Sequence, residues 1–216
     1  SRGRIEILKL DAQWHEKPLP GAWFEVKNVK TGELFRMVTG SDGKAVSGEL
    51  PAAYLGDDGR AVPYEYQVRE IQAPEGFCLD QRVWKFWFGN DHTPVAVQKI
   101  KAENEETRLW FSKSSFHTDH FVKGARLAIY NAKAENGKMQ PWGEPLETWI
   151  SGPEPHLVSG KLSGSRTYFL VEEEAPEGYS AADPVMFTVS ADGRSITEIS
   201  GASGLIQTLY RSEEHT

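Results

Sequence analysis

Residues 66–77 read YQVREIQAPEGF, and residues 168–179 read YFLVEEEAPEGY. In each stretch a tyrosine, an aliphatic residue and a glutamate fall on alternate positions, so on a β-strand their side chains share one face. The Ala-Pro-Glu-Gly segment then ends the strand, because proline donates no ladder hydrogen bond and glycine permits a turn. We therefore expect Glu70 and Glu172 to point into an apolar core, where a carboxyl group must be paired, hydrogen-bonded or protonated.

The rest of the chain is also typical of β-structure. Short alternating apolar runs are separated by Gly, Asn, Asp and Pro, and no amphipathic helix of useful length stands out. The expected strands of the first half are 5–10, 23–26, 64–70, 83–88 and 95–100. Those of the second half are 109–111, 126–130, 167–172, 185–189, 196–199 and 205–210.

The two halves align as an internal repeat. Lys9 and Glu70 of the first half correspond to Lys113 and Glu172 of the second, and the order of landmarks is the same about 100 residues later. We predict two domains, residues 1–105 and 106–216, each of ordinary size. The polar run at 103–107 has neither Gly nor Pro, which indicates a short and fairly stiff joint.

Composition limits the class of protein. The chain has 216 residues, of which 39% are hydrophobic and 11% aromatic, and this is a globular composition. A net charge of −7 without a basic cluster argues against a nucleic-acid partner. No apolar run has transmembrane length, and Cys78 as the single cysteine excludes an intrachain disulfide. The first residues do not read as a signal peptide, so we expect either that such a segment was removed or that the chain is a piece of a longer protein.

The ordered set of motifs resembles Cna B-type domains, the prealbumin-like repeats of Gram-positive pilins and surface adhesins. The motifs are Lys9-Leu10-Asp11, the PLPGA segment at 18–22 and the Glu-x-x-Ala-Pro-x-Gly-aromatic box. The resemblance covers nearly the whole chain, twice. It implies an all-β fold of two tandem reversed immunoglobulin-like (prealbumin-like) β-sandwich domains.

The resemblance also implies a function. The expected role is a structural or stalk module of an extracellular, cell-wall-attached surface protein or pilus subunit. Its expected partners are other domains of the same surface protein or pilus, with a host protein or glycan as a further candidate. No cofactor and no enzymatic turnover are expected.

Members of this family often carry a spontaneous Lys–Asn isopeptide bond. The resemblance assigns the amine to Lys9, the proton shuttle to Glu70 and the acyl group to Asn104, which shares a strand face with Ile100 and Ala102. Burial lowers the pKa of a lysine toward the neutral amine, and an apolar site keeps a carboxylic acid protonated. The residues alone also allow an ordinary Lys9–Glu70 ion pair, with Asn104 as a linker residue.

The second domain departs from this pattern. Lys113 and Glu172 are present, but residues 205–211 contain no Asn or Asp, and Tyr210 falls where the amide should be. A phenol cannot acylate an amine, so we expect no crosslink there and a Lys113–Glu172 ion pair instead. An acyl partner outside this sequence is the alternative.

Three weaker signals remain. Cys78 and Gln81 have the spacing of some internal thioesters, although a chance cysteine in a loop is the simpler interpretation. His117, Asp119 and His120 are candidate metal ligands, but we interpret them as solvated loop residues and predict no metal site.

Trp142 and Trp149 lie among prolines and glycines and form a candidate surface for a sugar or protein ligand, with core packing as the safer interpretation. They keep open a host-ligand- or glycan-binding adhesin region. A third candidate is an accessory binding module of a secreted enzyme.

Overall fold

The computed structural model describes residues 1–89, 95–112, 114–115, 118–121, 123–200 and 207–209. Every regular element in these ranges is a strand, which confirms the all-β prediction. None of the described residues forms a helix that is long and apolar enough to cross a membrane. The chain divides into two compact units, Ser1–Pro74 with Leu79–Glu105 and Glu75–Cys78 with Glu106–Thr216.

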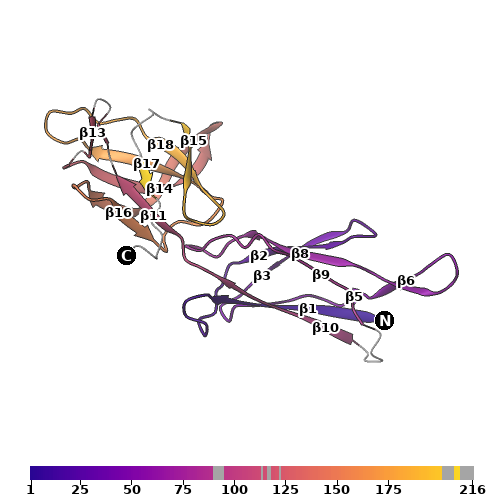
Figure 1. The fold of residues 1–216 in the computed structure, drawn as a ribbon. Coiled ribbons are helices and arrows are strands. Elements are labelled where there is room, and N and C mark those ends of the chain that lie inside the picture. The colour runs from indigo at the N-terminus through magenta and orange to yellow at the C-terminus, as the bar shows by residue number, and fades with distance from the viewer. Residues whose placement is uncertain (90–94, 113, 116–117, 122, 201–206, 210–216) are drawn as a thin grey trace. The chain divides into compact units, whose positions relative to one another are not determined.

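The first unit is a sandwich of two sheets (Figure 1). One sheet has the order β10-β1-β4, and β5 also pairs with β1. Its strands are β1 (Arg2–Asp11), β4 (Lys44–Val46), β5 (Leu50–Pro51) and β10 (Val95–Asn104). The other sheet has the order β3-β2-β8-β9, with β2 (Trp23–Asn28), β3 (Leu34–Val38), β8 (Tyr66–Gln72) and β9 (Val83–Phe86). A separate hairpin joins β6 (Ala53–Leu55) to β7 (Ala61–Pro63).

The core of the first unit lies between these sheets. Alternate residues of each strand point inward, as strand geometry requires. The buried apolar side chains from the two sheets are Ile5, Ile7, Phe24, Val26, Met37, Ala45, Tyr66, Val68, Phe86 and Ile100. The first and last strands of the unit, β1 and β10, are parallel neighbours, and their register pairs Lys9 with Ala102 and Asp11 with Asn104.

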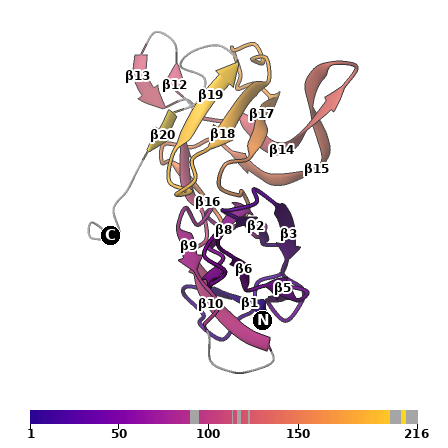
Figure 2. The same cartoon turned by 90° about the vertical axis from the view of Figure 1, so that its right-hand side faces the viewer.

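The second unit has a five-stranded sheet of order β15-β14-β17-β18-β19, visible in Figure 2. These strands are β14 (Arg126–Glu135), β15 (Lys138–Ile150), β17 (Thr167–Glu174), β18 (Val185–Val189) and β19 (Ile196–Ser200). A three-stranded sheet of order β16-β11-β20 contains β11 (Arg108–Ser112), β16 (His156–Ser159) and β20 (Gln207–Leu209). β12 (Ser114–Ser115) and β13 (Thr118–Phe121) form a hairpin.

The two units share local details. The amide of Ala22 donates to the hydroxyl of Thr39 (3.0 Å), and the amide of Ala125 donates likewise to Ser151 (2.9 Å). They differ at the last strand, because β10 runs parallel to β1 whereas β20 runs antiparallel to β11. The correspondence between the halves therefore does not extend to the direction of the last strand.

The sequence did not indicate β15, which has 13 residues. It contains Pro141, Gly143 and Pro145, which suggest turns rather than a strand. The structure accommodates them because β15 is an edge strand and the β14–β15 register shifts between Ile129 and Asn131. Proline is tolerated at sheet edges and at bulges, where no ladder hydrogen bond is lost.

Candidate crosslinking site

Lys9 is fully buried, which is exceptional for a lysine. It follows Ile5 and Ile7 on the inward face of β1, so the strand itself directs the side chain into the core. Its Nζ lies 3.3 Å from Oε1 of Glu70 and 5.6 Å from the ring centroid of Phe24. The amine is thus held between an acid and an aromatic face.

Glu70 reaches the same point from the opposite sheet, on the inward face of β8. Its Oε2 accepts a hydrogen bond from the backbone amide of Asp80 (2.6 Å). The side-chain nitrogen of Asn104 lies 3.2 Å from Oε1 and 3.1 Å from Oε2. Oε1 is therefore close to both the amine of Lys9 and the amide nitrogen of Asn104.

Asn104 is the last residue of β10 and is buried. Ile100, Ala102 and Asn104 share the inward face of that strand, as expected from the spacing. Since Lys9 is paired with Ala102, Asn104 is its diagonal neighbour two residues further along. Asn104 is thus a core residue, and the interpretation as a simple linker residue is wrong.

Burial controls the protonation of this cluster. Desolvation lowers the pKa of Lys9, although the charges of Glu70 and Asp80 oppose the shift. Desolvation raises the pKa of Glu70, opposed by the charge of Lys9. Both directions favour a neutral amine beside a protonated acid.

Asp80 and Arg82 belong to the site and were not predicted. Oδ2 of Asp80 lies 3.8 Å from Nζ of Lys9. Arg82 holds Asp80 with both Nε (2.9 Å to Oδ1) and Nη2 (2.5 Å to Oδ2). Burial would raise the pKa of Asp80, but the hydrogen bonds of Arg82 and the charge of Lys9 together hold it below its ordinary value. Neither residue is in a strand, so no alternation pattern could indicate where they point.

The second unit repeats part of this arrangement. Glu172 is buried, and its Oε2 accepts a hydrogen bond from the backbone amide of Ala182 (2.9 Å). Glu70 and Asp80 make the same contact, so Ala182 stands in the place of Asp80. Lys113 and Tyr210 lie outside the described residues, and the expected Lys113–Glu172 ion pair stays a prediction.

The described residues show no thioester or metal site at the weaker sequence signals. His117 and the side chains of Asp119 and His120 lie outside what the structure describes. In the described part of the chain no three His, Cys, Asp or Glu residues are grouped as a metal site would require. The thiol of Cys78 donates to the carbonyl oxygen of Asp192 (3.0 Å).

The structure separates the two tryptophans of the candidate ligand surface. Trp149 is buried and stacks on His156 with ring centroids 4.7 Å apart, so the core interpretation is correct for this residue. Trp142 is 54% exposed, and Nζ of Lys133 lies 5.1 Å from its ring centroid. Of these two tryptophans, only Trp142 is exposed and could contact a ligand.

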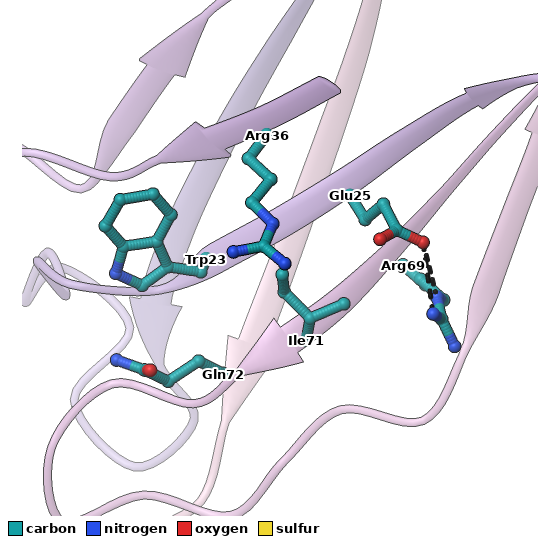
Figure 3. Close-up of a pocket in the computed structure, with 6 residues that line it drawn as sticks. All are labelled: Trp23, Glu25, Arg36, Arg69, Ile71 and Gln72. Carbon is teal, nitrogen blue, oxygen red and sulfur yellow. Dashed lines mark hydrogen bonds and ion pairs between the residues drawn. The ribbon is translucent and has the colours of Figure 1, made fainter. Parts of the chain in front are cut away.

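A shallow hollow of about 570 Å³ lies on the outer face of the β3-β2-β8 layer (Figure 3). Glu25 sits between Arg36 and Arg69, which face it from the two neighbouring strands. The carboxylate of Glu25 is bound by Arg69 (3.0 Å), as the dashed line in Figure 3 shows. The remaining lining residues are Trp23, Ile71 and Gln72.

Comparison with protein families gives one match. Residues 3–103 match the family described as SpaA, prealbumin-like fold domain. Over these residues the chain is similar to that prealbumin-like domain, in agreement with the fold that the motifs predicted. Comparison with curated proteins gives no significant match.

Several solved structures are similar to the chain. The TIE protein of Bacillus anthracis has 24% identity and a TM-score of 0.42, over 89% of this chain and 32% of that one. A mutant of the shaft pilin SpaA of Lactobacillus rhamnosus GG has 17% identity and a TM-score of 0.44, over 92% and 98%. A streptococcal ancillary pilin has 20% identity and a TM-score of 0.44, over 88% and 59%. The chain thus spans about a third of the TIE protein.

Proposed function

We propose that this chain is a structural module of a Gram-positive surface protein or pilus subunit, tied internally by an isopeptide bond between Lys9 and Asn104. The observation that carries the proposal is the position of Glu70. Its Oε1 lies 3.3 Å from Nζ of Lys9 and 3.2 Å from Nδ2 of Asn104, within a buried site. One carboxyl oxygen can therefore exchange protons with both reacting nitrogens.

The reaction replaces one amide by another. The neutral Nζ of Lys9 attacks Cγ of Asn104, and the new C–N bond forms as the bond from Cγ to Nδ2 breaks. Glu70 takes one proton from Nζ and passes one to Nδ2, so ammonia leaves and the acid is restored. Folding supplies the high effective concentration that an amine and an unactivated amide need in order to react.

The positions of the two strands joined by this bond suggest that it resists mechanical force. β1 and β10 are the first and last strands of their unit, so force applied along the chain enters at one and leaves at the other. A covalent bond between Lys9 and Asn104 would carry that load and spare the hydrogen bonds between β1 and β10. The bond forms once per chain, so the module does not act as an enzyme on other molecules. The similarity of residues 3–103 to the prealbumin-like fold domain of SpaA supports a role as extracellular, cell-wall-attached scaffolding for neighbouring domains.

Intact mass tests the proposal. The wild-type chain should lack one ammonia, and its digest should contain a branched peptide joining Lys9 to Asn104. Glu70→Ala and Asn104→Ala should have the full calculated mass, whereas Glu172→Ala, in the corresponding acid of the second unit, should still lack one ammonia. A wild-type mass equal to the calculated mass would leave Lys9 and Glu70 as a buried ion pair.

The hollow in Figure 3 favours a second candidate function, an adhesin region that binds a glycan or a host protein. Trp23 is 37% exposed, and a half-exposed indole beside arginine and amide groups suits a sugar ring. Binding to glycans or matrix proteins that is lost in Trp23→Ala but kept in Asn104→Ala would support this role. Loss in Trp142→Ala instead would place the ligand on the second unit.

A further inference from the structure

We propose that Asp80 is a positioning residue of the crosslinking reaction. It is a second carboxylate, which holds the attacking amine of Lys9 and the carboxyl group of Glu70 in the geometry that the reaction needs. This inference rests on the proposed function, because it concerns how fast and with which partner Lys9 reacts. Asp80 lies outside the strands and the motif box that assign the three reacting residues.

Two contacts join Asp80 to the amine of Lys9 and to the carboxyl group of Glu70. Its Oδ2 lies 3.8 Å from Nζ of Lys9, and its backbone amide donates to Oε2 of Glu70 at 2.6 Å. The side chain thus faces the amine, while the main chain fixes the carboxyl group that must exchange protons with it. The charged and titratable groups around Nζ are Glu70, Asp80 and Arg82.

Arg82 keeps Asp80 in place. The guanidinium is bound to both carboxylate oxygens of Asp80, and it lies over the ring of Trp84, 5.0 Å from the centroid. A bidentate arginine fixes the orientation of a carboxylate and favours its ionised form. An ionised carboxylate is a poor acyl donor, so this clamp also explains why Lys9 should react with Asn104 rather than with nearby Asp80.

The charge of Asp80 acts on the attack itself. When a neutral amine attacks an amide carbon, its nitrogen becomes positive before it loses a proton. A carboxylate fixed beside that nitrogen stabilises the developing charge more than it stabilises the neutral amine, which is the condition for a faster reaction. Asp80 meets this condition because its Oδ2 lies 3.8 Å from Nζ of Lys9.

The second unit provides an internal comparison. Ala182 makes the same backbone hydrogen bond to Glu172 that Asp80 makes to Glu70, but it has no carboxylate. The backbone contact is therefore common to both units, whereas the residue that makes it carries a carboxylate in the first unit and a methyl group in the second. This difference is independent of the missing acyl residue in the segment 205–211.

The test is the rate of ammonia loss in newly synthesised full-length chain, quenched in denaturing acid at successive times and followed by intact mass. Asp80→Asn keeps the size of the side chain and removes its charge, and we expect the bond to form about tenfold more slowly. The control is Asp58→Asn, because Asp58 and Arg60 form a similar but exposed Asp-x-Arg pair. This control should crosslink at the wild-type rate.

The pH profile separates a positioning role from a merely structural one. Without the anion at position 80 the charged form of Lys9 is less stable, so the rising limb of the rate should move to lower pH even though the maximum rate falls. Added to the non-crosslinking Asn104→Ala chain, Asp80→Asn should leave the urea midpoint nearly unchanged. A wild-type rate and pH profile in Asp80→Asn would overturn the inference. A large loss of stability when Asp80→Asn is added to Asn104→Ala would also overturn it. Neither outcome would contradict the proposed bond itself. A wild-type chain without ammonia loss would overturn both.

Discussion

At the scale of single residues, the site depends on ionisable groups that folding removes from water. Lys9 is placed in the core by the alternation of β1, and Glu70 by the alternation of β8. Each charged group alone would carry a large desolvation cost, which lowers the pKa of Lys9 and raises the pKa of Glu70. The charge of each partner opposes the pKa shift of the other, so the pair offsets part of this cost. Conversion of the amine to an amide removes the titrating lysine permanently.

The uncrosslinked chain should show the cost of Lys9 as a dependence of stability on pH. In Asn104→Ala/Glu70→Gln the amine has lost a neighbouring acid, so its pKa should fall further below the ordinary lysine value of about 10.4. Between these two pKa values the unfolded chain binds more protons than the folded chain, so stability should rise with pH.

Urea unfolding between neutral pH and the ordinary lysine pKa measures this slope. Asn104→Ala alone is the reference, and its slope should be smaller because Glu70 still supports the charged amine. The raised pKa of Glu70 adds an opposite trend in the reference at acidic pH, where stability falls as pH rises from the ordinary glutamate value. Equal alkaline slopes in the two chains would argue that Glu70 does not support the charge of Lys9.

At the scale of elements, turns and edge strands decide how the sheets meet. The turn before β4 contains Gly43, whose φ is +73°. A Cβ at this position would lie 2.5 Å from the carbonyl oxygen of Lys9, so the turn can pack against β1 only as glycine. This close approach fixes the end of β1 from which the Lys9 side chain enters the core.

Gly43→Ala should therefore disturb the crosslinking strand. We expect a loss of roughly 2–3 kcal/mol of unfolding free energy, from left-handed backbone strain together with the clash. Gly32→Ala is the control, because Gly32 has a similar φ of +75° but open space around its Cβ position. It should cost roughly 1–2 kcal/mol. Chemical denaturation in the Asn104→Ala background gives both values. Equal losses of unfolding free energy in the two variants would mean that the structure around β1 adjusts to the added methyl group at no measurable cost.

The strand β15 offers a second comparison between two residues of one type. Trp149→Ala should destabilise the second unit by about 3–5 kcal/mol, because it removes a large core side chain. Trp142→Ala should change stability by less than about 0.5 kcal/mol, because its side chain faces solvent. Thermal or urea unfolding of both variants measures the difference. A comparable loss in Trp142→Ala would show that its contact with Lys133 is structural.

At the scale of the whole molecule, the two units are expected to differ in covalent connection. A bond between Lys9 and Asn104 closes a loop that contains nearly all of the first unit. In the chain-entropy treatment of crosslinks, closing a loop of about 100 residues stabilises by about 4–5 kcal/mol. No such tie is expected in the second unit, which should be the weaker one.

Calorimetry of the full chain should then show two transitions. Asn104→Ala should lower the upper transition markedly and leave the lower one in place, since the substitution acts only on the first unit. Limited proteolysis provides an independent assignment, with the first cleavages in residues 106–216 of the wild-type chain. Cleavage in the first unit before the second would contradict the assignment of the bond.

Much of this protein could be predicted from local pattern. Strand alternation indicated eleven of the twenty strands in the described residues, the inward direction of Glu70 and Asn104, and the all-β class, because side-chain direction in a strand depends only on position. The nine strands that it missed are β3 to β7, β12, β13, β15 and β16. The repeated box indicated a prealbumin-like family, and residues 3–103, which contain its first copy, are similar to the prealbumin-like fold domain of SpaA. Local pattern failed at β15, where only the position at the sheet edge makes proline acceptable.

Only the tertiary structure could bring Asp80 and Arg82 to Lys9. Their positions depend on the path of a segment without regular structure, for which the sequence has no periodic signal. The same reason applies to the two tryptophans of β15, since burial of Trp149 and exposure of Trp142 follow from the register of β14 and β15 and the bulge between them. The sequence therefore determined which residues face a core, and the packing of strands and connecting segments determined which of them meet.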